Sequence, residues 1–326
     1  MNNQLIVNES LKSLLKRLQG QNALLVYSPT AAAKASEAGL ISSEDLRPYD
    51  TFPISCNDKV SYDTLESCKL DYKIILGFGG GTVIDIAKFF SHHIKNSKCV
   101  AIPSMLSTNV FATDKIAAIR AGGKQTENSK LPEEIVFDTD LLNLSTKENL
   151  YGLADAFSIY TALQDWVYAD ESSKEPIKAE FYERALNILG FACEVAQQPE
   201  PKGIFKVLLE AGYITNDYGN GRPESGSEHI IAKEIENLIT IPHALAVTCG
   251  IAITSQLQDT YNCAVQPLKD IGIFDEIRSY SKLTPMILKT ALENVTPRKD
   301  RYTVLDRFCP LGPRIPSLIS GSGLYG

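Results

Sequence analysis

The first half of the chain alternates short apolar runs with stretches whose apolar residues recur at helical spacing. Helical spacing follows Pro29 and returns over residues 82–92. The apolar runs are rich in aliphatic residues and predict buried strands at 23–28, 73–76, 99–103 and 135–138. Strands and helices in alternation predict right-handed βαβ units around a parallel sheet.

From Lys147 onward the pattern changes to long helical stretches with few strand candidates. The change predicts two domains, an α/β domain over residues 1–145 and an all-α domain over 146–326; a single core rarely exceeds about 300 residues. The tail 309–326 is rich in Pro, Gly and Ser, and we expect it to be poorly ordered. The expected helices lie at 151–169, 176–197, 203–218, 226–238, 243–261, 267–274 and 285–295.

Composition narrows the class of protein. Hydrophobic residues make up 44% and charged residues 22%, and the net charge is −7, so we expect no nucleic-acid partner. No apolar run reaches the ~18 residues of a membrane span, and the N-terminus has no signal-peptide core. The seven cysteines form no CxxC pair, which is typical of reduced thiols. We therefore expect a cytoplasmic protein with no nucleic-acid and no membrane partner; a homo-oligomer stays open.

A glycine-rich turn, GFGGG at residues 77–81, joins a predicted strand to a predicted helix. Glycines let the backbone approach a pyrophosphate, which the free N–H groups of a helix start can bind. Thr82 would cap the helix or bond a phosphate oxygen, and Asp85 would complement the helix dipole from the first turn. The alternative is a tight turn that needs positive φ, because the spacing is not GxGxxG.

The helical half holds two of the four histidines, His229 and His243, each after a turn signal. His92 and His93 end a predicted helix and are expected at the surface. A divalent metal that acts as a Lewis acid needs three protein ligands and an open position, and Asp155 is the acidic candidate. Taken alone, each histidine fits a structural role, and Asp155 fits compensation of a helix dipole.

The string GGGTVIDIAK (79–88) resembles the GGGxxxDxAK element of the iron-containing alcohol dehydrogenase superfamily. That superfamily includes glycerol dehydrogenase, glycerol-1-phosphate dehydrogenase and dehydroquinate synthase. The resemblance implies that the first domain binds NAD or NADP through its pyrophosphate. The residues carried over are Gly79, Gly80, Gly81, Thr82 and Asp85.

Residues 102–109, IPSMLSTN, are similar to the PTxxST(D) segment of the polyol dehydrogenases, which lines the nicotinamide half of the cofactor. Asn109 stands where glycerol dehydrogenases have an Asp that contacts the substrate. Lys115 on the same loop would suit an anionic substrate, and a solvated surface lysine is the alternative. The matching cofactor residues are Ser104, Ser107 and Thr108.

Three segments of the second half resemble the metal-binding segments of glycerol-1-phosphate dehydrogenases: YGLADAFSIYTALQDW (151–166), SGSEHIIAKEIE (225–236) and PHALAVTCGIAI (242–253). They imply a metal centre of Asp155, His229 and His243. A fourth string, RKDRYTVL (298–305), resembles RxDRYTxL of the same branch. The spacing between the two histidines is shorter than in that branch, and the tail matches none of it.

The resemblance implies reversible hydride transfer between NAD or NADP and a small ketone or polyol, with dihydroxyacetone phosphate as the first candidate. The metal would act as a Lewis acid on the substrate oxygen. Two histidines and one aspartate suit zinc, and nickel and iron are compatible.

Two other functions stay open. A dehydroquinate synthase-like cyclase shares the fold, the NAD and the metal, but has Glu as the first ligand and a further His where this chain has Lys233. An inactive homologue with a binding role would fit the short histidine spacing and the unmatched tail.

Overall fold

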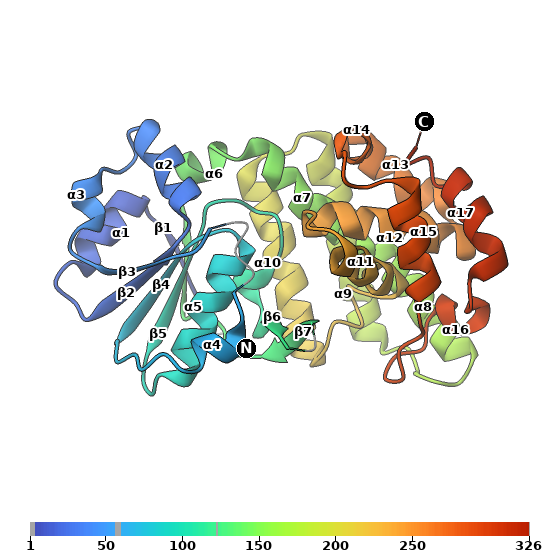
Figure 1. The fold of residues 1–326 in the computed structure, drawn as a ribbon, viewed down its shortest axis with the longest axis horizontal. Helices are drawn as coiled ribbons and strands as arrows, with labels where there is room; N and C mark the ends of the chain where they lie inside the picture. Colours follow the sequence, from blue (N-terminus) through green and yellow to red (C-terminus); the bar gives the residue numbers. More distant parts are fainter. Residues whose placement is uncertain (1–3, 56–59, 122, 326) are drawn as a thin grey trace. The chain divides into compact units, whose positions relative to one another are not determined.

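The computed structural model describes residues 4–55, 60–121 and 123–325. The chain divides into two compact units, Met1–Asn149 and Leu150–Gly326 (Figure 1). The sequence predicted a boundary after residue 145. Within the described ranges, no helix combines the length and the apolar character that crossing a membrane requires.

The first unit contains a six-stranded, all-parallel sheet with the strand order β1-β8-β5-β4-β2-β3. A separate antiparallel pair, β6 and β7, follows β5 along the chain. The strands are β1 Leu5–Asn8, β2 Ala23–Tyr27, β3 Asp50–Pro53, β4 Ile74–Gly79, β5 Lys98–Pro103, β6 Lys115–Arg120, β7 Gly123–Asn128 and β8 Glu134–Phe137.

Alternate residues of the central strands enter two separate cores, one on each face of the sheet. Leu25 and Leu76 pack on one face with helices α1 (Leu11–Leu18) and α2 (Pro29–Glu37). Leu24 and Ile75 pack on the other face with α5 (Gly81–His93). Figure 1 shows α1 and α2 on the opposite side of the sheet from α5. The remaining helices of the unit are α3 Ser43–Leu46, α4 Tyr62–Leu65, the 3-10 turn η1 Val110–Ala112 and α6 Thr139–Asn143.

The four predicted strands are confirmed as β2, β4, β5 and β8, whereas β1, β3, β6 and β7 were not predicted. The two missed sheet strands form its edges, and most of their residues are exposed. An edge strand exposed to solvent lacks the continuous apolar run of a central one, so its sequence gives little signal.

The second unit consists of helices. Two predicted helices are divided: 151–169 breaks at Phe157, and 243–261 ends at Leu257 before a new helix starts at Tyr261. The helices are α7 Thr146–Ala156, α8 Ser158–Glu171, α9 Ala179–Gln197, α10 Pro201–Tyr218, α11 Ser227–Leu238, α12 His243–Leu257, α13 Tyr261–Asp270, α14 Ile273–Ser279, α15 Pro285–Asn294, α16 Val304–Phe308, the 3-10 turn η2 Gly312–Arg314 and α17 Ile315–Gly321.

Residues 310–325 are ordered, so the prediction of a poorly ordered tail was wrong over this range. Ile315, Leu318 and Leu324 are buried, and α17 packs against α12 and α15. The prolines and glycines of this segment led to the prediction of disorder. Pro316, however, lies in the first turn of α17, where the missing N–H would have no partner within the helix in any case.

Helix α12 is the core of the second unit, since nearly all of its side chains are buried, including those of Val247, Ile251 and Ile253. It packs against α11 through a close backbone contact. A Cβ built on Gly250 would lie 2.1 Å from the carbonyl oxygen of Glu228, a distance that no carbon can occupy. Only glycine at position 250 allows the two helices to approach this closely.

Replacing Gly250 with alanine should therefore lower the free energy of unfolding by about 3 kcal/mol or more, the upper range for overpacked cores. Chemical denaturation followed by circular dichroism measures the change. Gly190→Ala is the matched control, because Gly190 also lies inside a helix but has no atom within 4 Å of its would-be Cβ. That variant should gain roughly 0.5–1 kcal/mol from helix propensity. Equal stability of the two variants would contradict this account of the contact.

Candidate functional site

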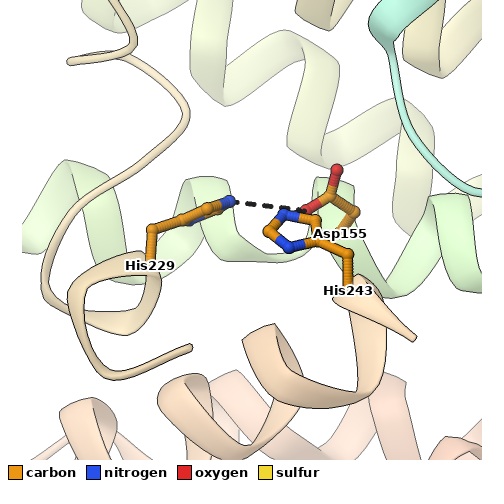
Figure 2. Close-up of side chains that lie close together, drawn as sticks. All are labelled: Asp155, His229 and His243. Atoms are coloured by element: carbon orange, nitrogen blue, oxygen red, sulfur yellow. Dashed lines mark ion pairs between the residues drawn. The ribbon is translucent and has the colours of Figure 1, made fainter. Parts of the chain in front are cut away.

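The second unit brings together Asp155, His229 and His243 from three helices. Asp155 lies in the last turn of α7, His229 in the first turn of α11, and His243 is the first residue of α12. Figure 2 shows both imidazole rings directed at the carboxylate of Asp155. Because helix starts meet a helix end here, the three side chains project toward one point.

The distances suit a single metal ion. The Nε2 atoms of His229 and His243 lie 3.5 and 3.7 Å from Oδ1 of Asp155. One ligand atom from each residue falls within 4.8 Å of the other two. Tetrahedral bonds of about 2.0–2.1 Å would place ligand atoms about 3.3 Å apart, so the two distances to Asp155 need only a small contraction.

The buried oxygen Oδ1 of Asp155 has no hydrogen-bond partner among the described residues. A buried carboxylate oxygen without a donor is costly, and a cation would satisfy it. Burial raises the pKa of Asp155, but the neighbouring His229 and His243 lower it by a larger amount. The net pKa of Asp155 is therefore below the ordinary value. For His229, burial lowers the pKa, but Asp155 and Glu228 together raise it to about 10. The carboxylates thus favour positive charge at this point, and a divalent cation bound at Nε2 would supply that charge in place of the second proton of His229.

The opposite nitrogen of each imidazole faces a second carboxylate. Nδ1 of His229 lies 2.9 Å from Oε1 of Glu228, and Nδ1 of His243 lies 2.9 Å from Oε1 of Glu236. Neither glutamate was predicted from the sequence. Both lie on α11 beside the predicted ligands, but a single Glu on a helix is common and gives no distinguishing signal.

A buried aspartate, Asp165 on α8, holds the loop before α11. Its carboxylate accepts hydrogen bonds from the backbone N–H of Ser227 at 2.7 Å, from that of Val304 at 2.9 Å, and from Nε2 of Gln258 at 2.9 Å. Burial and the nearby charge of Glu228 raise the pKa of Asp165 to about 6. The position of His229 thus depends on a carboxylate that lies outside the candidate ligand set.

Two arginines complete this support. Arg222, which is fully buried, donates to the backbone oxygens of Asp165 at 3.1 Å and Tyr302 at 2.9 Å. Arg301 donates to the backbone oxygen and the hydroxyl of Ser225, at 2.6 and 2.9 Å. The RKDRYTVL string is therefore structural in this chain: it fastens the loop that precedes His229.

In the first unit, the glycine-rich turn joins β4 to α5 without positive φ. Gly80 is the N-cap of α5, with φ of −81°, and none of the glycines at 77–81 lies in the left-handed region. The alternative of a turn that needs positive φ was wrong. A Cβ on Gly77 would come within 2.8 Å of Ala87, and one on Gly79 within 2.8 Å of Val83. These glycines let α5 approach the strand closely.

Thr82 and Asp85 differ from their predicted roles at the helix start. Gly80, not Thr82, is the N-cap, and Thr82 is exposed. Asp85 lies beyond the first turn and is buried; its Oδ2 accepts from the N–H of Ala117 at 3.0 Å and its Oδ1 pairs with Lys88 at 3.3 Å. The prediction that Asp85 complements the helix dipole from the first turn was wrong, since it anchors β6.

The loop after β5 lies beside this turn. Ser104 N–H donates to the oxygen of Gly79 at 2.9 Å, and a Cβ on Gly81 would lie 3.2 Å from Oγ1 of Thr108. The hydroxyls of Ser104 and Thr108 are buried without a hydrogen-bond partner among the described residues. Two such hydroxyls, beside a helix N-terminus that has no side-chain cap among the described residues, fit a ligand rich in acceptors, such as a dinucleotide. Ser107 and Asn109 lie on the same loop and are half-buried.

Lys115 begins β6 and is held by neighbours: its Nζ lies 3.0 Å from Oδ1 of Asp114 and 2.7 Å from Oδ1 of Asn128. These contacts favour the structural alternative over a substrate contact. His92 and His93 are exposed at the end of α5, as predicted.

Comparison with known proteins identifies a matching family and several similar proteins. The family described as iron-containing alcohol dehydrogenase matches residues 6–145. Glycerol-1-phosphate dehydrogenase [NAD(P)+] of Thermoplasma volcanium is 26% identical over 275 residues, covering 79% of this chain and 77% of that protein. The enzyme of the same name from Methanoregula boonei is 26% identical over 314 residues, covering 88% and 82%.

Among solved structures, a probable glycerol dehydrogenase from Sinorhizobium meliloti 1021 has the same fold, with a TM-score of 0.66 and 15% identity over 98% of this chain and 96% of that one. The parallel-sheet unit and the helical unit thus match the predicted fold class. Residues 6–145 thus match the iron-containing alcohol dehydrogenase family, and the relatives similar to most of the chain are named as NAD(P)-linked glycerol-1-phosphate dehydrogenases.

Proposed function

We propose that this chain is a metal-dependent, NAD(P)-linked dehydrogenase that interconverts dihydroxyacetone phosphate, or a similar small ketone, and the corresponding alcohol. The observation that carries the proposal is the buried Oδ1 of Asp155, which faces Nε2 of two histidines and has no hydrogen-bond partner among the described residues. The relatives named glycerol-1-phosphate dehydrogenase [NAD(P)+] support the substrate class and the cofactor.

In this proposal Asp155, His229 and His243 hold one divalent ion. Three protein ligands leave the fourth position of a tetrahedral site open, as in catalytic rather than structural centres. When bound, the ion supplies Lewis acidity toward a carbonyl oxygen. The ligand set suits zinc, and nickel or iron are compatible; the name of the family supports iron as well.

The turn in the first unit would hold the cofactor. The free N–H groups at the start of α5, next to Gly80 and Gly81, would bind the pyrophosphate, and the hydroxyls of Ser104 and Thr108 would meet the acceptors of the cofactor. When bound, the nicotinamide supplies the hydride, so that ketone, NAD(P)H and a proton give alcohol and NAD(P)⁺.

The two histidines of the second unit do not donate the proton that converts the ketone to the alcohol. Both nitrogens of His229 and of His243 face carboxylates, so neither ring is free to carry a proton to the product. We therefore infer that water or a ribose hydroxyl delivers the proton. Such a route needs no additional titrating side chain at the site.

A phosphorylated substrate needs a cation. Lys233 lies one helical turn after His229 on α11 and is exposed, so both side chains leave the same face of the helix. We infer that Lys233 attracts the phosphate of the substrate. Lys115, which is paired with Asp114, is the weaker candidate.

The first prediction concerns the metal. Purified protein should contain about one divalent ion per chain, and Asp155→Asn should reduce the bound metal by at least about tenfold, because the amide keeps the shape but removes the charge of the ligand. Elemental analysis measures the content, and circular dichroism checks that the variant is folded. Active wild-type protein without any metal would refute this site.

The second prediction concerns the cofactor. Gly80→Val should abolish binding of NADH and NADPH, since a branched side chain would occupy the space at the start of α5. Calorimetric titration measures the affinity. Gly80→Ala is a graded control, because its Cβ would lie an ordinary 3.4 Å from Sδ of Met105. Both variants should keep their metal. An unchanged affinity in Gly80→Val would mean that the turn only packs α5.

The third prediction separates a dehydrogenase from a cyclase. A cyclase returns its hydride within each turnover, whereas a dehydrogenase oxidises one NAD(P)H for each product. We expect net loss of absorbance at 340 nm with dihydroxyacetone phosphate, and Lys233→Ala should raise KM for this substrate more than for dihydroxyacetone. Phosphate release from a seven-carbon sugar phosphate, without net oxidation, would establish the cyclase. Preference for unphosphorylated dihydroxyacetone would refute the proposed phosphorylated substrate but not the dehydrogenase reaction.

A further inference from the structure

Two carboxylates outside the proposed ligand set contact the two histidines. Glu228 precedes His229 in the first turn of α11, and Glu236 lies in the last turn of that helix, from which it reaches His243 at the start of α12. Each accepts a hydrogen bond of 2.9 Å from Nδ1 of its histidine. The two pairs come from different parts of the helix yet have the same geometry.

An ionised carboxylate can only accept hydrogen bonds, so the Nδ1 atom that faces it must carry the hydrogen. In a neutral imidazole, Nε2 then keeps its lone pair. Both Nε2 atoms are the ones that face Oδ1 of Asp155, at 3.5 and 3.7 Å. The opposite tautomer would direct an N–H at the metal and a lone pair at each glutamate, so both glutamates select the form that can bind a metal.

The two glutamates are held to different degrees. The side chain of Glu228 is fully buried; it also accepts from the N–H of Gly226 and, at 2.8 Å, from the hydroxyl of Thr161. The side chain of Glu236 is 12% exposed. Glu228 is thus built into the core, whereas Glu236 can be changed with less disturbance of the fold.

We propose that Glu228 and Glu236 are positioning residues that set the metal affinity of this protein, by fixing the tautomer and the ring orientation of His229 and His243. The inference rests on the proposed metal site and adds two residues that act on the ion only through the imidazoles. Carboxylates that accept from a ligand histidine typically change metal affinity by about 10–100-fold.

The test uses Glu236→Ala and Glu236→Gln in the full chain, freed of metal with a chelator. Zinc affinity is measured by competition with a chromophoric chelator. We expect about 10–100-fold weaker binding for Glu236→Ala. Glu236→Gln should lie between this variant and the wild type, because its amide oxygen still accepts from Nδ1–H but carries no charge. Glu234→Gln is the matched control: it changes a half-buried glutamate on the same helix and should bind zinc as the wild type does.

A second measurement reports on the tautomer itself, which a merely structural role would not change. Correlation of ring ¹⁵N and ¹H shifts assigns the hydrogen of each imidazole. His243 of the metal-free wild type and of metal-free Glu234→Gln should be in the Nδ1–H form. In metal-free Glu236→Ala we expect a mixture of the two tautomers, while denaturation curves of the metal-free variants should match that of the wild type.

Wild-type zinc affinity in Glu236→Ala, together with an unchanged tautomer, would overturn the positioning role and leave the metal site intact. Weaker binding with an unchanged tautomer would also overturn it, because the loss would then come from charge alone. Failure of the wild type itself to bind zinc or any other divalent ion would instead refute the proposed function, a result distinct from the other two.

Discussion

The placement of negative charge inside the second unit governs much of its structure. Asp155, Glu228 and Glu236 surround two partly buried imidazoles, and a buried carboxylate is costly unless donors or a cation face it. The glutamates have their donors in the histidine rings. Asp155 has an oxygen that lacks one among the described residues, and the directions of α7, α11 and α12 bring the two Nε2 atoms toward that oxygen.

In both units, glycine allows two backbone segments to pack closely, but with different consequences. In the first unit, Gly77 and Gly79 allow α5 to pack closely on β4. In the second, Gly250 allows α12 to contact the backbone of α11 at Glu228, directly before His229. The second glycine therefore sets the separation of the helices that carry the two histidines, although it contacts neither ring.

The sequence predicted the elements whose signals are local. The buried strands β2, β4, β5 and β8 have continuous apolar runs, and most helices of the second half have a clear period. The residues of the candidate centre could be named only through motifs of a family, because Asp155 and the histidines lie on three helices whose meeting is set by packing. Glu228, Glu236 and Asp165 gave no signal, since their significance lies in what they contact.

The ties between Arg301 and Ser225, and between Val304 and Asp165, span a long stretch of sequence to hold the loop before His229. These ties order events during synthesis. A ribosome releases residues 301–304 after all three proposed ligands, so a nascent chain that already contains these ligands still lacks the contacts that hold the loop before His229. Stable metal binding at the proposed site must then wait until Val304 has been synthesised, and a chain truncated before Arg301 would bind metal weakly while keeping all three proposed ligands.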